Sequence, residues 1–312
     1  MKKWCTIKPG DTVDLIAPAA RCADALLTDV IKLLTSWGLH CNVPPDIFGD
    51  DLLCANNDAR RFEQLNAALT NTTSKAVICV RGGYGSARLI PMLEKIAAPN
   101  HNKLFVGMSD ITALHIFLQQ QWQWPVLHGA VALDKFSPES IQQLKEVMFG
   151  EIATLKFADL IPLNAIAAKE TIIASTITGG NLTLVQACLG TSWQLKPNNK
   201  IIFLEEVNER GFRVDRMLEH LKQAAIFTGI KALLLGDFTK GEEPDGTSKV
   251  PAVIERFAKE ADFPVLQISG IGHGFINKPL PLGTKVNISL GRKPMLECFF
   301  VPPFEKGGLG GI

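Results

Sequence analysis

A serine at the end of a short apolar run is the first residue whose setting suggests chemistry. Val106-Gly107-Met108-Ser109-Asp110 leads from a predicted strand into a predicted helix, and its glycine permits a sharp bend. This arrangement resembles a nucleophile elbow, which lifts a serine hydroxyl above the edge of a sheet. Ile111 stands where that motif usually has a second glycine, and a helix N-cap is the structural alternative for Ser109.

Two distant segments carry groups that could assist such a nucleophile. Glu205 and Glu206 directly follow the apolar run 201–204, and His273 stands between two glycines after another predicted strand. A carboxylate can orient a histidine and stabilise its imidazolium. Adjacent strand residues face opposite sides, so at most one of the two glutamates should face a site. The structural alternatives are a solvated loop for Glu205 and Glu206 and a solvated turn for His273.

A glycine-rich loop follows the buried-type strand 76–80. Its sequence is Arg81-Gly82-Gly83-Tyr84-Gly85, and Tyr84 is the only tyrosine in the chain. Backbone amides in such a loop can cradle a phosphate or build part of an oxyanion hole. A tight turn without a ligand is the alternative. A dinucleotide fingerprint is broken, because Arg88 stands where a glycine or alanine is needed.

Alternating strands and helices must position these segments. The pattern predicts βαβ units on a mostly parallel sheet. We interpret residues 134–169, which contain Pro138, Gly150 and Pro162, as a less regular crossing between domains. Antiparallel strands are expected over 285–301. The strands are predicted at 12–18, 76–80, 104–107, 200–204, 232–235 and 264–268, and the helices at 25–37, 58–69, 86–96, 110–120 and 214–225.

Composition limits the classes of function. Basic and acidic residues number 32 and 31 among 312 residues, which gives no sign of nucleic-acid binding or an electrostatic membrane anchor. Lys8 and Asp11 interrupt any signal-peptide core, and no apolar run is long enough to span a membrane. Seven scattered cysteines without a Cys-x-x-Cys pair fit a reduced cytosolic protein. No histidine pair has metal-ligand spacing, so no metal site is predicted.

Taken together, the motifs resemble those of the LD-carboxypeptidases, also called muramoyl-tetrapeptide carboxypeptidases. The resemblance runs from about Leu15 to about Ser289. Thr178 and Arg210-Gly211 depart from the family pattern, away from the three candidate catalytic residues. The motifs that carry the resemblance occur in the order Arg81–Gly85, Gly107-x-Ser109-Asp110, Gly179-Gly180-Asn181-Leu182, Leu204–Val207, Arg213–Leu218, Gly272-His273 and Leu280–Gly283.

The resemblance implies a Ser-Glu-His triad and the residues around it. Ser109 would be the nucleophile, His273 the general base and Glu205 the orienting carboxylate. The backbone amides of Gly83 and Asp110 would form the oxyanion hole. No cofactor is implied. The candidates for substrate binding are Tyr84, Asn181, Arg213 and Arg216.

The resemblance also implies the fold class and the function. The expected fold is α/β: an N-terminal Rossmann- or flavodoxin-like parallel-sheet domain and a C-terminal mixed α/β domain, with the active site in the groove between them. We place the nucleophile-bearing domain at 1–140, a connection at 141–170, the Glu- and His-bearing domain at 171–305 and a flexible tail at 306–312. The expected substrate is a small peptide, murein tetrapeptide, from which hydrolysis of an L-D bond releases the terminal D-Ala during cytoplasmic peptidoglycan recycling.

Three alternatives stay open. The closest is a related serine peptidase that cleaves a peptide-nucleotide antibiotic and gives self-immunity. The second is a nucleotide- or phosphate-sugar-binding oxidoreductase that uses the loop 82–85. The third is a binding protein without catalytic activity. A homodimer is left open as the assembly.

Overall fold

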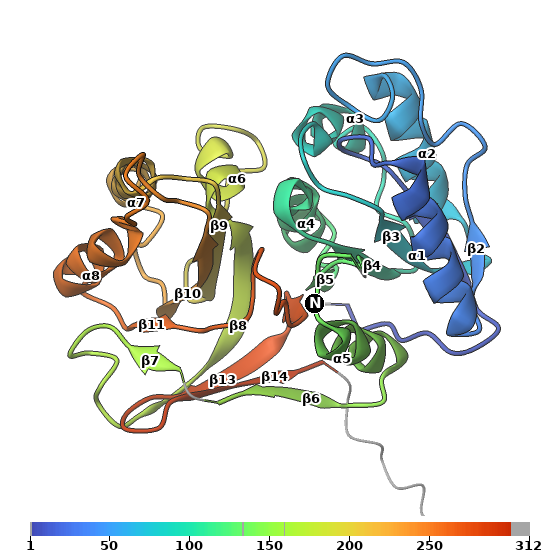
Figure 1. Cartoon of the computed structure of the whole chain (residues 1–312). Coiled ribbons are helices and arrows are strands. Elements are labelled where there is room, and N and C mark those ends of the chain that lie inside the picture. Colours follow the sequence, from blue (N-terminus) through green and yellow to red (C-terminus); the bar gives the residue numbers. More distant parts are fainter. Residues whose placement is uncertain (1, 133, 159, 301–312) are drawn as a thin grey trace, which may run out of the picture.

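A six-stranded sheet occupies the N-terminal half of the protein (Figure 1). The computed structural model describes residues 2–132, 134–158 and 160–300, so the tail expected at 306–312 lies outside the described residues. The first five strands pair in parallel, and only β12 is antiparallel. In spatial order the strands are β12 (Leu280–Leu282), β5 (Val126–His128), β4 (Leu104–Gly107), β3 (Ser74–Cys79), β1 (Thr12–Ile16) and β2 (His40–Asn42).

An eight-stranded mixed sheet forms the second half. The long strand β8 pairs with β13 along its first part and with β9 along its last part, so the sheet curls there. Strands β8 to β11 run parallel and the outer pairs run antiparallel. In spatial order the strands are β6 (Thr154–Phe157), β14 (Met295–Phe299), β13 (Lys285–Ser289), β8 (Ile172–Asn181), β9 (Ile201–Val207), β10 (Ala232–Thr239), β11 (Val265–Gln267) and β7 (Ile161–Pro162).

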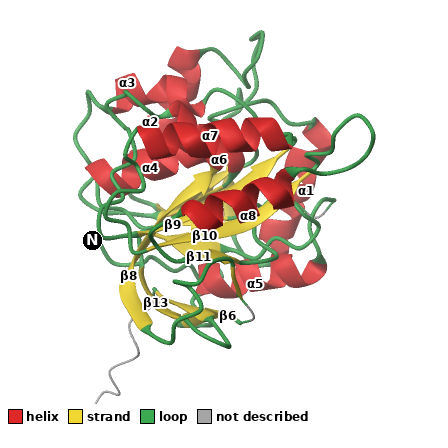
Figure 2. Cartoon of the chain, turned by 90° about the vertical axis from the view of Figure 1, so that its left-hand side faces the viewer, coloured by secondary structure: helices red, strands yellow, loops and turns green. Residues whose placement is uncertain are grey.

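Helices cover the two sheets. Figure 2 shows α7 and α8 lying over β9, β10 and β11. Helix α7 buries Val214, Met217, Leu218 and Leu221, which recur at the helical spacing that produces one apolar face. Helix α4 contacts β8 where the two halves meet. The helices are α1 (Asp24–Ser36), α2 (Asp58–Thr70), α3 (Ile90–Leu93), α4 (Thr112–Gln121), α5 (Pro138–Phe149), α6 (Leu182–Ala187), α7 (Gly211–Gln223) and α8 (Val250–Glu260), with 3-10 turns η1 (Ser86–Leu89) and η2 (Ser109–Ile111).

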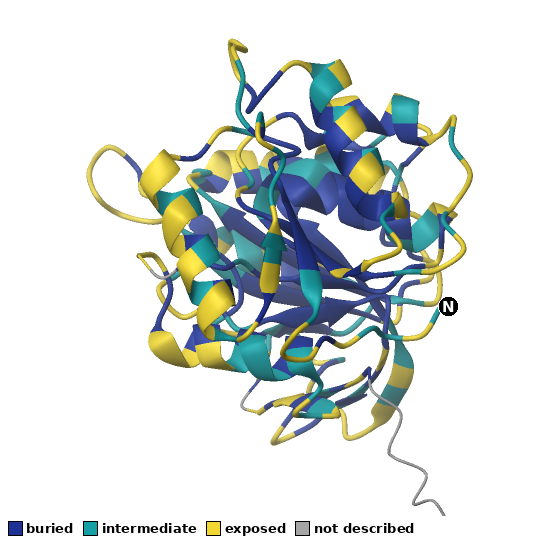
Figure 3. Ribbon diagram, turned by 90° about the vertical axis from the view of Figure 1, so that its right-hand side faces the viewer, coloured by how far each residue is buried: buried dark blue, intermediate teal, exposed yellow. Residues whose placement is uncertain are grey.

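The interior is continuous between the two halves. The strands are buried along most of their length, as Figure 3 shows. One apolar core includes Leu127 of β5 and Phe203 of β9, although these strands belong to different sheets. The ring of His128, the last residue of β5, meets the ring of Phe203 edge-on at 5.5 Å. The sheets are therefore packed against each other rather than joined only by a linker.

The fold class is the predicted one, but the segment 134–169 differs from the prediction. It contains the helix α5 and two short strands. The Ser137 hydroxyl accepts a hydrogen bond from the Ser140 N–H, Pro138 lies in the first turn, and Gly150 ends the helix at φ 68°. Proline at the first position and glycine just after the last are ordinary helix boundaries. Taken singly, Pro138 and Gly150 each indicate a break in regular structure. Taken together, they mark the two ends of one helix.

Two smaller differences concern boundaries, and a third concerns elements that were not predicted. The helix predicted at 86–96 is a 3-10 turn followed by the short α3, in which Pro91 lies near the start. The strand predicted to end at Leu204 continues to Val207, so both glutamates lie within β9. Helix α8 and strand β8 were not predicted. In the part of the chain that the structure describes, every helix is too short or too polar to cross a membrane.

Candidate active site

Ser109 adopts the backbone conformation expected of a nucleophile elbow. Its φ is 61°, a value that costs energy for a residue with a side chain and is concentrated at functional sites. It follows β4 and begins η2, where Met108 is the N-cap and no side chain caps the turn. A Cβ at Gly107 would lie 2.5 Å from Ile111 Cγ2, so the isoleucine side chain fills the space that this glycine leaves. The bend at Ser109 therefore forms with isoleucine in place of the second glycine.

Glu205 and His273 form a hydrogen-bonded pair. Glu205 Oε2 lies 2.7 Å from His273 Nδ1, and the glutamate has no exposed surface. Glu206 faces the opposite side of β9, where it accepts hydrogen bonds from the backbone N–H of Thr183 at 2.7 Å and from Asn181 Nδ2 at 3.1 Å. The alternation of side chains along β9 therefore separates an orienting carboxylate from a structural one.

The electrostatic environment suits His273 as a base. Burial alone would lower the pKa of His273, but the hydrogen bond and the charge of Glu205 outweigh it and raise the pKa above the ordinary histidine value. Burial also raises the pKa of the Glu206 carboxyl. His128 is fully buried nearby, and burial lowers its pKa to about 4 despite the opposing charge of Glu205. The two imidazoles therefore differ: Glu205 favours the protonated form of His273, while burial favours the neutral form of His128.

The loop that carries His273 needs glycine for close packing. Gly272 has φ 145°, and a Cβ there would lie 3.1 Å from the Asp237 carbonyl oxygen and 3.2 Å from Glu205 Oε2. The Gly270 N–H donates to both carboxylate oxygens of Asp237 at 3.1 Å. Burial raises the pKa of the Asp237 carboxyl. These contacts fix the loop beside β10 and aim the imidazole at Glu205.

Asn277 connects the histidine loop to the elbow. Its Nδ2 donates to Met108 Sδ at 3.2 Å, and its Oδ1 accepts from the Gly272 N–H at 3.2 Å. Its own backbone N–H donates to Ser140 Oγ at the start of α5. The residues next to Ser109 and His273 are therefore tied to the same amide. Within the described residues the Ser109 hydroxyl and the His273 ring are not hydrogen-bonded to each other, a separation common in catalytic sites without substrate.

The glycine-rich loop lies directly against the elbow. A Cβ at Gly82 would lie 2.9 Å from Ser109 Cβ and 3.2 Å from the Asp110 nitrogen. Asp110 Oδ2 accepts from the Ser86 N–H at 2.8 Å, and Ser86 Oγ donates to the Asp110 carbonyl at 2.6 Å. The candidate oxyanion amides of Gly83 and Asp110 thus belong to segments fastened together. Gly82 belongs to the predicted loop but was assigned no role of its own from the sequence, although one of two consecutive glycines often serves a close backbone approach.

The predicted substrate-binding residues lie in different settings. Tyr84 is half exposed in the glycine loop. Asn181 is buried, caps α6 by accepting from the Leu184 N–H, and donates to Glu206. Arg213 pairs with Glu209 at 3.3 Å on α7, and Arg216 lies 5.3 Å above the exposed Phe212 ring. The polar atoms of Asn181 are therefore used within the protein, whereas Tyr84 and Arg216 present exposed surface.

Metal-binding side chains do not gather anywhere in the described residues: no group of three or more histidine, cysteine, aspartate or glutamate residues could hold an ion. The seven cysteines are free thiols.

Comparison with known proteins identifies the class of protein. The LD-carboxypeptidase N-terminal domain matches residues 13–129, and the LD-carboxypeptidase C-terminal domain matches residues 174–288. A putative carboxypeptidase of Rickettsia conorii is 40% identical over 89% of this chain and 87% of its own length. The chain therefore belongs to the LD-carboxypeptidase family, whose members are serine carboxypeptidases.

Solved structures share the fold. The crystal structure of muramoyltetrapeptide carboxypeptidase from Oxalobacter formigenes superposes with a TM-score of 0.80 at 27% identity, covering 94% of this chain and all of that one. MccF in complex with glutamyl sulfamoyl guanosine gives a TM-score of 0.81 at 17% identity, covering 96% of this chain and 99% of that one. The second likeness concerns the fold alone.

Proposed function

We propose that this chain is a cytoplasmic LD-carboxypeptidase that releases the terminal D-Ala from murein tetrapeptide, with Ser109, Glu205 and His273 as its triad. The observation that carries the proposal is the hydrogen bond between the buried Glu205 and His273, joined through Asn277 to the elbow of Ser109. The 27% identity to a muramoyltetrapeptide carboxypeptidase supports the choice of substrate.

The proposed reaction has two halves. His273 Nε2 takes the proton of the Ser109 hydroxyl as the serine oxygen attacks the carbonyl carbon of the diamino acid. Glu205 holds the ring through Nδ1 and stabilises the imidazolium. The imidazolium then gives its proton to the leaving amine of D-Ala. In the second half, His273 activates a water that hydrolyses the acyl-enzyme and regenerates Ser109.

The oxyanion that forms in both halves needs donors held in advance. We propose the N–H groups of Gly83 and Asp110 for this role. Loss of one such donor typically lowers the turnover rate by about 10²–10³. Tyr84, Arg213 and Arg216 are proposed to contact the substrate. For Asn181, whose side chain is already bonded to Glu206, we propose a contribution through the shape of the β8–α6 corner.

The nucleophile is proposed to lie in a domain at 1–140 and the other triad residues in a domain at 171–305, with 141–170 between them. The second domain then contributes β12 to the first sheet. A groove between the domains is the proposed location of the substrate. This arrangement makes catalysis depend on both halves of the chain.

The direct test is incubation of the purified chain with murein tetrapeptide, followed by mass analysis for loss of one alanine. The expected result is conversion to tripeptide by the natural chain and none by Ser109→Ala. A second arm uses aminoacyl sulfamoyl adenosine, which separates the murein peptidase from the antibiotic-cleaving alternative. Cleavage of the nucleoside alone, with the tetrapeptide intact, would overturn the proposed substrate while leaving the triad in place.

A further inference from the structure

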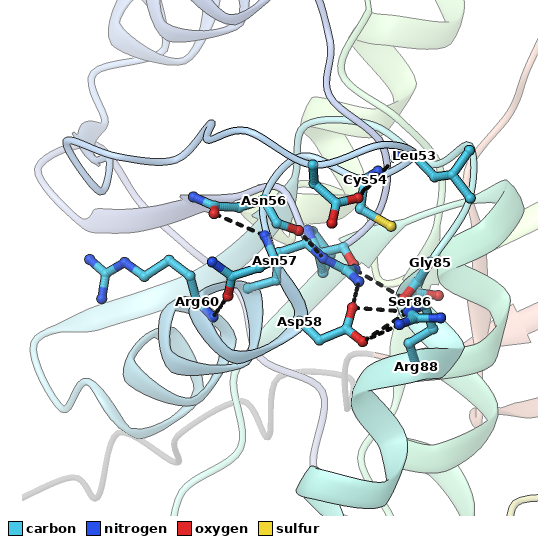
Figure 4. Close-up of polar contacts among 12 residues, drawn as sticks. Leu53, Cys54, Asn56, Asn57, Asp58, Arg60, Gly85, Ser86 and Arg88 are labelled. Atoms are coloured by element: carbon cyan, nitrogen blue, oxygen red, sulfur yellow. Dashed lines mark hydrogen bonds and ion pairs between the residues drawn. The ribbon is translucent and has the colours of Figure 1, made fainter.

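A buried arginine lies behind the glycine-rich loop. Arg61, in the first turns of α2, has a side chain without exposed surface. Its guanidinium donates to three backbone carbonyls: Asn56 at 3.0 Å, Gly85 at 2.9 Å, and Pro18. It also donates to Asp58 Oδ1 at 2.6 Å. One side chain thus joins α2, the segment after β1 and the loop. Figure 4 shows three of the residues that it contacts, Asn56, Asp58 and Gly85.

The loop is held at both ends by this arrangement. At its start, the Gly82 carbonyl accepts from the Ala20 N–H at 3.2 Å, two residues after Pro18. At its end, the Gly85 carbonyl accepts from Arg61. Gly85 has φ 115°, and a Cβ there would lie 2.4 Å from Cys54 Sγ and 3.2 Å from Arg61 Nη1. The glycine therefore makes room for the guanidinium, and the guanidinium fixes the glycine.

From Gly85 the contacts continue to the nucleophile. Ser86 follows Gly85 and is bonded through its N–H and its hydroxyl to Asp110, the residue after Ser109. Asp58 also binds Arg88, with Nη2 to Oδ2 at 2.6 Å (Figure 4), so the same carboxylate contacts both Arg61 and a residue of η1. The path from Arg61 to the elbow consists of two hydrogen-bonded steps.

We propose that Arg61 is a positioning residue that keeps the amides of the loop 82–85 aimed at the oxyanion formed on the Ser109 adduct. Charge-assisted hydrogen bonds to several carbonyls suit a planar guanidinium with five donors, and lysine cannot reproduce the fork. The inference rests on the proposed function for its catalytic part. Its structural part, the coupling of Arg61 to the loop, can be tested independently.

The test compares Arg61→Lys with Arg60→Lys. Arg60 is the next residue on the same helix and pairs with Asp46 and Glu63 at the surface, away from Gly85 (Figure 4). In Arg61→Lys we expect kcat/KM to fall about 10–100-fold, a partial loss of one oxyanion donor, with KM little changed. Binding of a peptide boronate, in which boron replaces the attacked carbonyl carbon, should weaken in parallel, while binding of the tripeptide product should not. Arg60→Lys should stay within about twofold in every measurement.

Hydrogen exchange supplies a readout independent of activity. Amides of the peptide 80–89 should exchange faster in Arg61→Lys than in Arg60→Lys. If Arg61→Lys does not fold, Asp58→Asn keeps the arginine and removes its charged partner, and a smaller effect in the same direction is expected. The proposal would be overturned if the two arginine variants had equal hydrogen exchange over 80–89 and equal kcat/KM. It would also be overturned if active-site titration showed that the loss of kcat/KM in Arg61→Lys comes wholly from unfolded protein. If the natural chain does not cleave tetrapeptide, the proposed function is overturned. The hydrogen-exchange result still decides whether Arg61 is coupled to the loop 82–85.

Discussion

Glu205 Oε2 lies 2.7 Å from Nδ1 of His273, a residue 68 positions later in the chain. The carboxylate is fully buried and the ring is partly exposed, so the pair has an inner end and an outer end. The inner end fixes the tautomer, and the outer nitrogen remains available for a proton from a nucleophile.

Replacing Glu205 with glutamine should lower kcat by about 10⁴, the loss typical when an orienting carboxylate becomes an amide. It should also lower the pKa of His273, because the carboxylate is what raises that pKa. His273 acts as a base only when neutral, so the acid limb of kcat/KM should move to lower pH in Glu205→Gln. A pH profile and an NMR titration of the ring check both effects. An acid limb at the same pH in both proteins would contradict the assignment.

His128 predicts a pH dependence of stability. Its pKa in the folded protein is about 4, below the ordinary value, so the unfolded chain binds more protons between about pH 6.5 and 4. The free energy of unfolding should therefore fall as the pH drops through this window, by up to about 3 kcal/mol in total. Urea melts of the natural chain and of His128→Gln measure this, since the variant lacks the titrating ring. The difference in the free energy of unfolding between the natural chain and His128→Gln should shrink or change sign toward pH 4.

Substituting alanine for Gly82 should abolish most activity. Its φ lies outside the left-handed region, but the new Cβ would be 2.9 Å from both the Met108 carbonyl oxygen and Ser109 Cβ. The loop must then move away from the elbow, and kcat should fall by about 10² or more. Gly190→Ala is the matched control: its Cβ meets nothing within 4 Å, and its φ of 76° costs stability without touching the site. Comparable activity losses in the two variants would count against the predicted role of the loop.

Asn277→Ala should reduce kcat through the orientation of His273. The substitution leaves the Gly272 N–H without its partner and breaks the contact with Met108, so the free energy of unfolding should fall by about 1–3 kcal/mol. KM should change less than kcat, because Asn277 lies behind the catalytic groups. Ser140→Ala, which loses only the hydroxyl that accepts from the Asn277 N–H, is the control. Equal kcat values in the two variants would exclude a role for the amide.

The local sequence explains much of the fold. The runs at β3 and β4 are apolar throughout because these strands are covered on both faces, and such runs are recognisable without a structure. The alternation rule also separated the two glutamates of β9. The triad itself remains a prediction from the family resemblance. The structure adds the geometry of one of its two hydrogen bonds, the one between Glu205 and His273.

Other features depend on contacts between distant segments and carry no local signal. Arg60 and Arg61 are adjacent and chemically identical, yet one lies at the surface and the other is buried against Gly85. Only the packing of α2 on the loop distinguishes them. Helix α5 was missed for a different reason: its proline and glycine are boundary signals whose meaning depends on each other.

The edge strand β12 has a consequence for how the protein is made. Strand β5 leaves the ribosome with one side unpaired, because its neighbour Leu280–Leu282 is translated much later. At about 5–20 residues per second, the roughly 150 intervening residues occupy on the order of 10–30 s. During that interval the nascent chain contains Ser109 but lacks His273. It also exposes the free edge of β5, with which strands of other chains could pair. The proposed base and the strand that covers this edge therefore arrive together, once residues 273–282 have been translated.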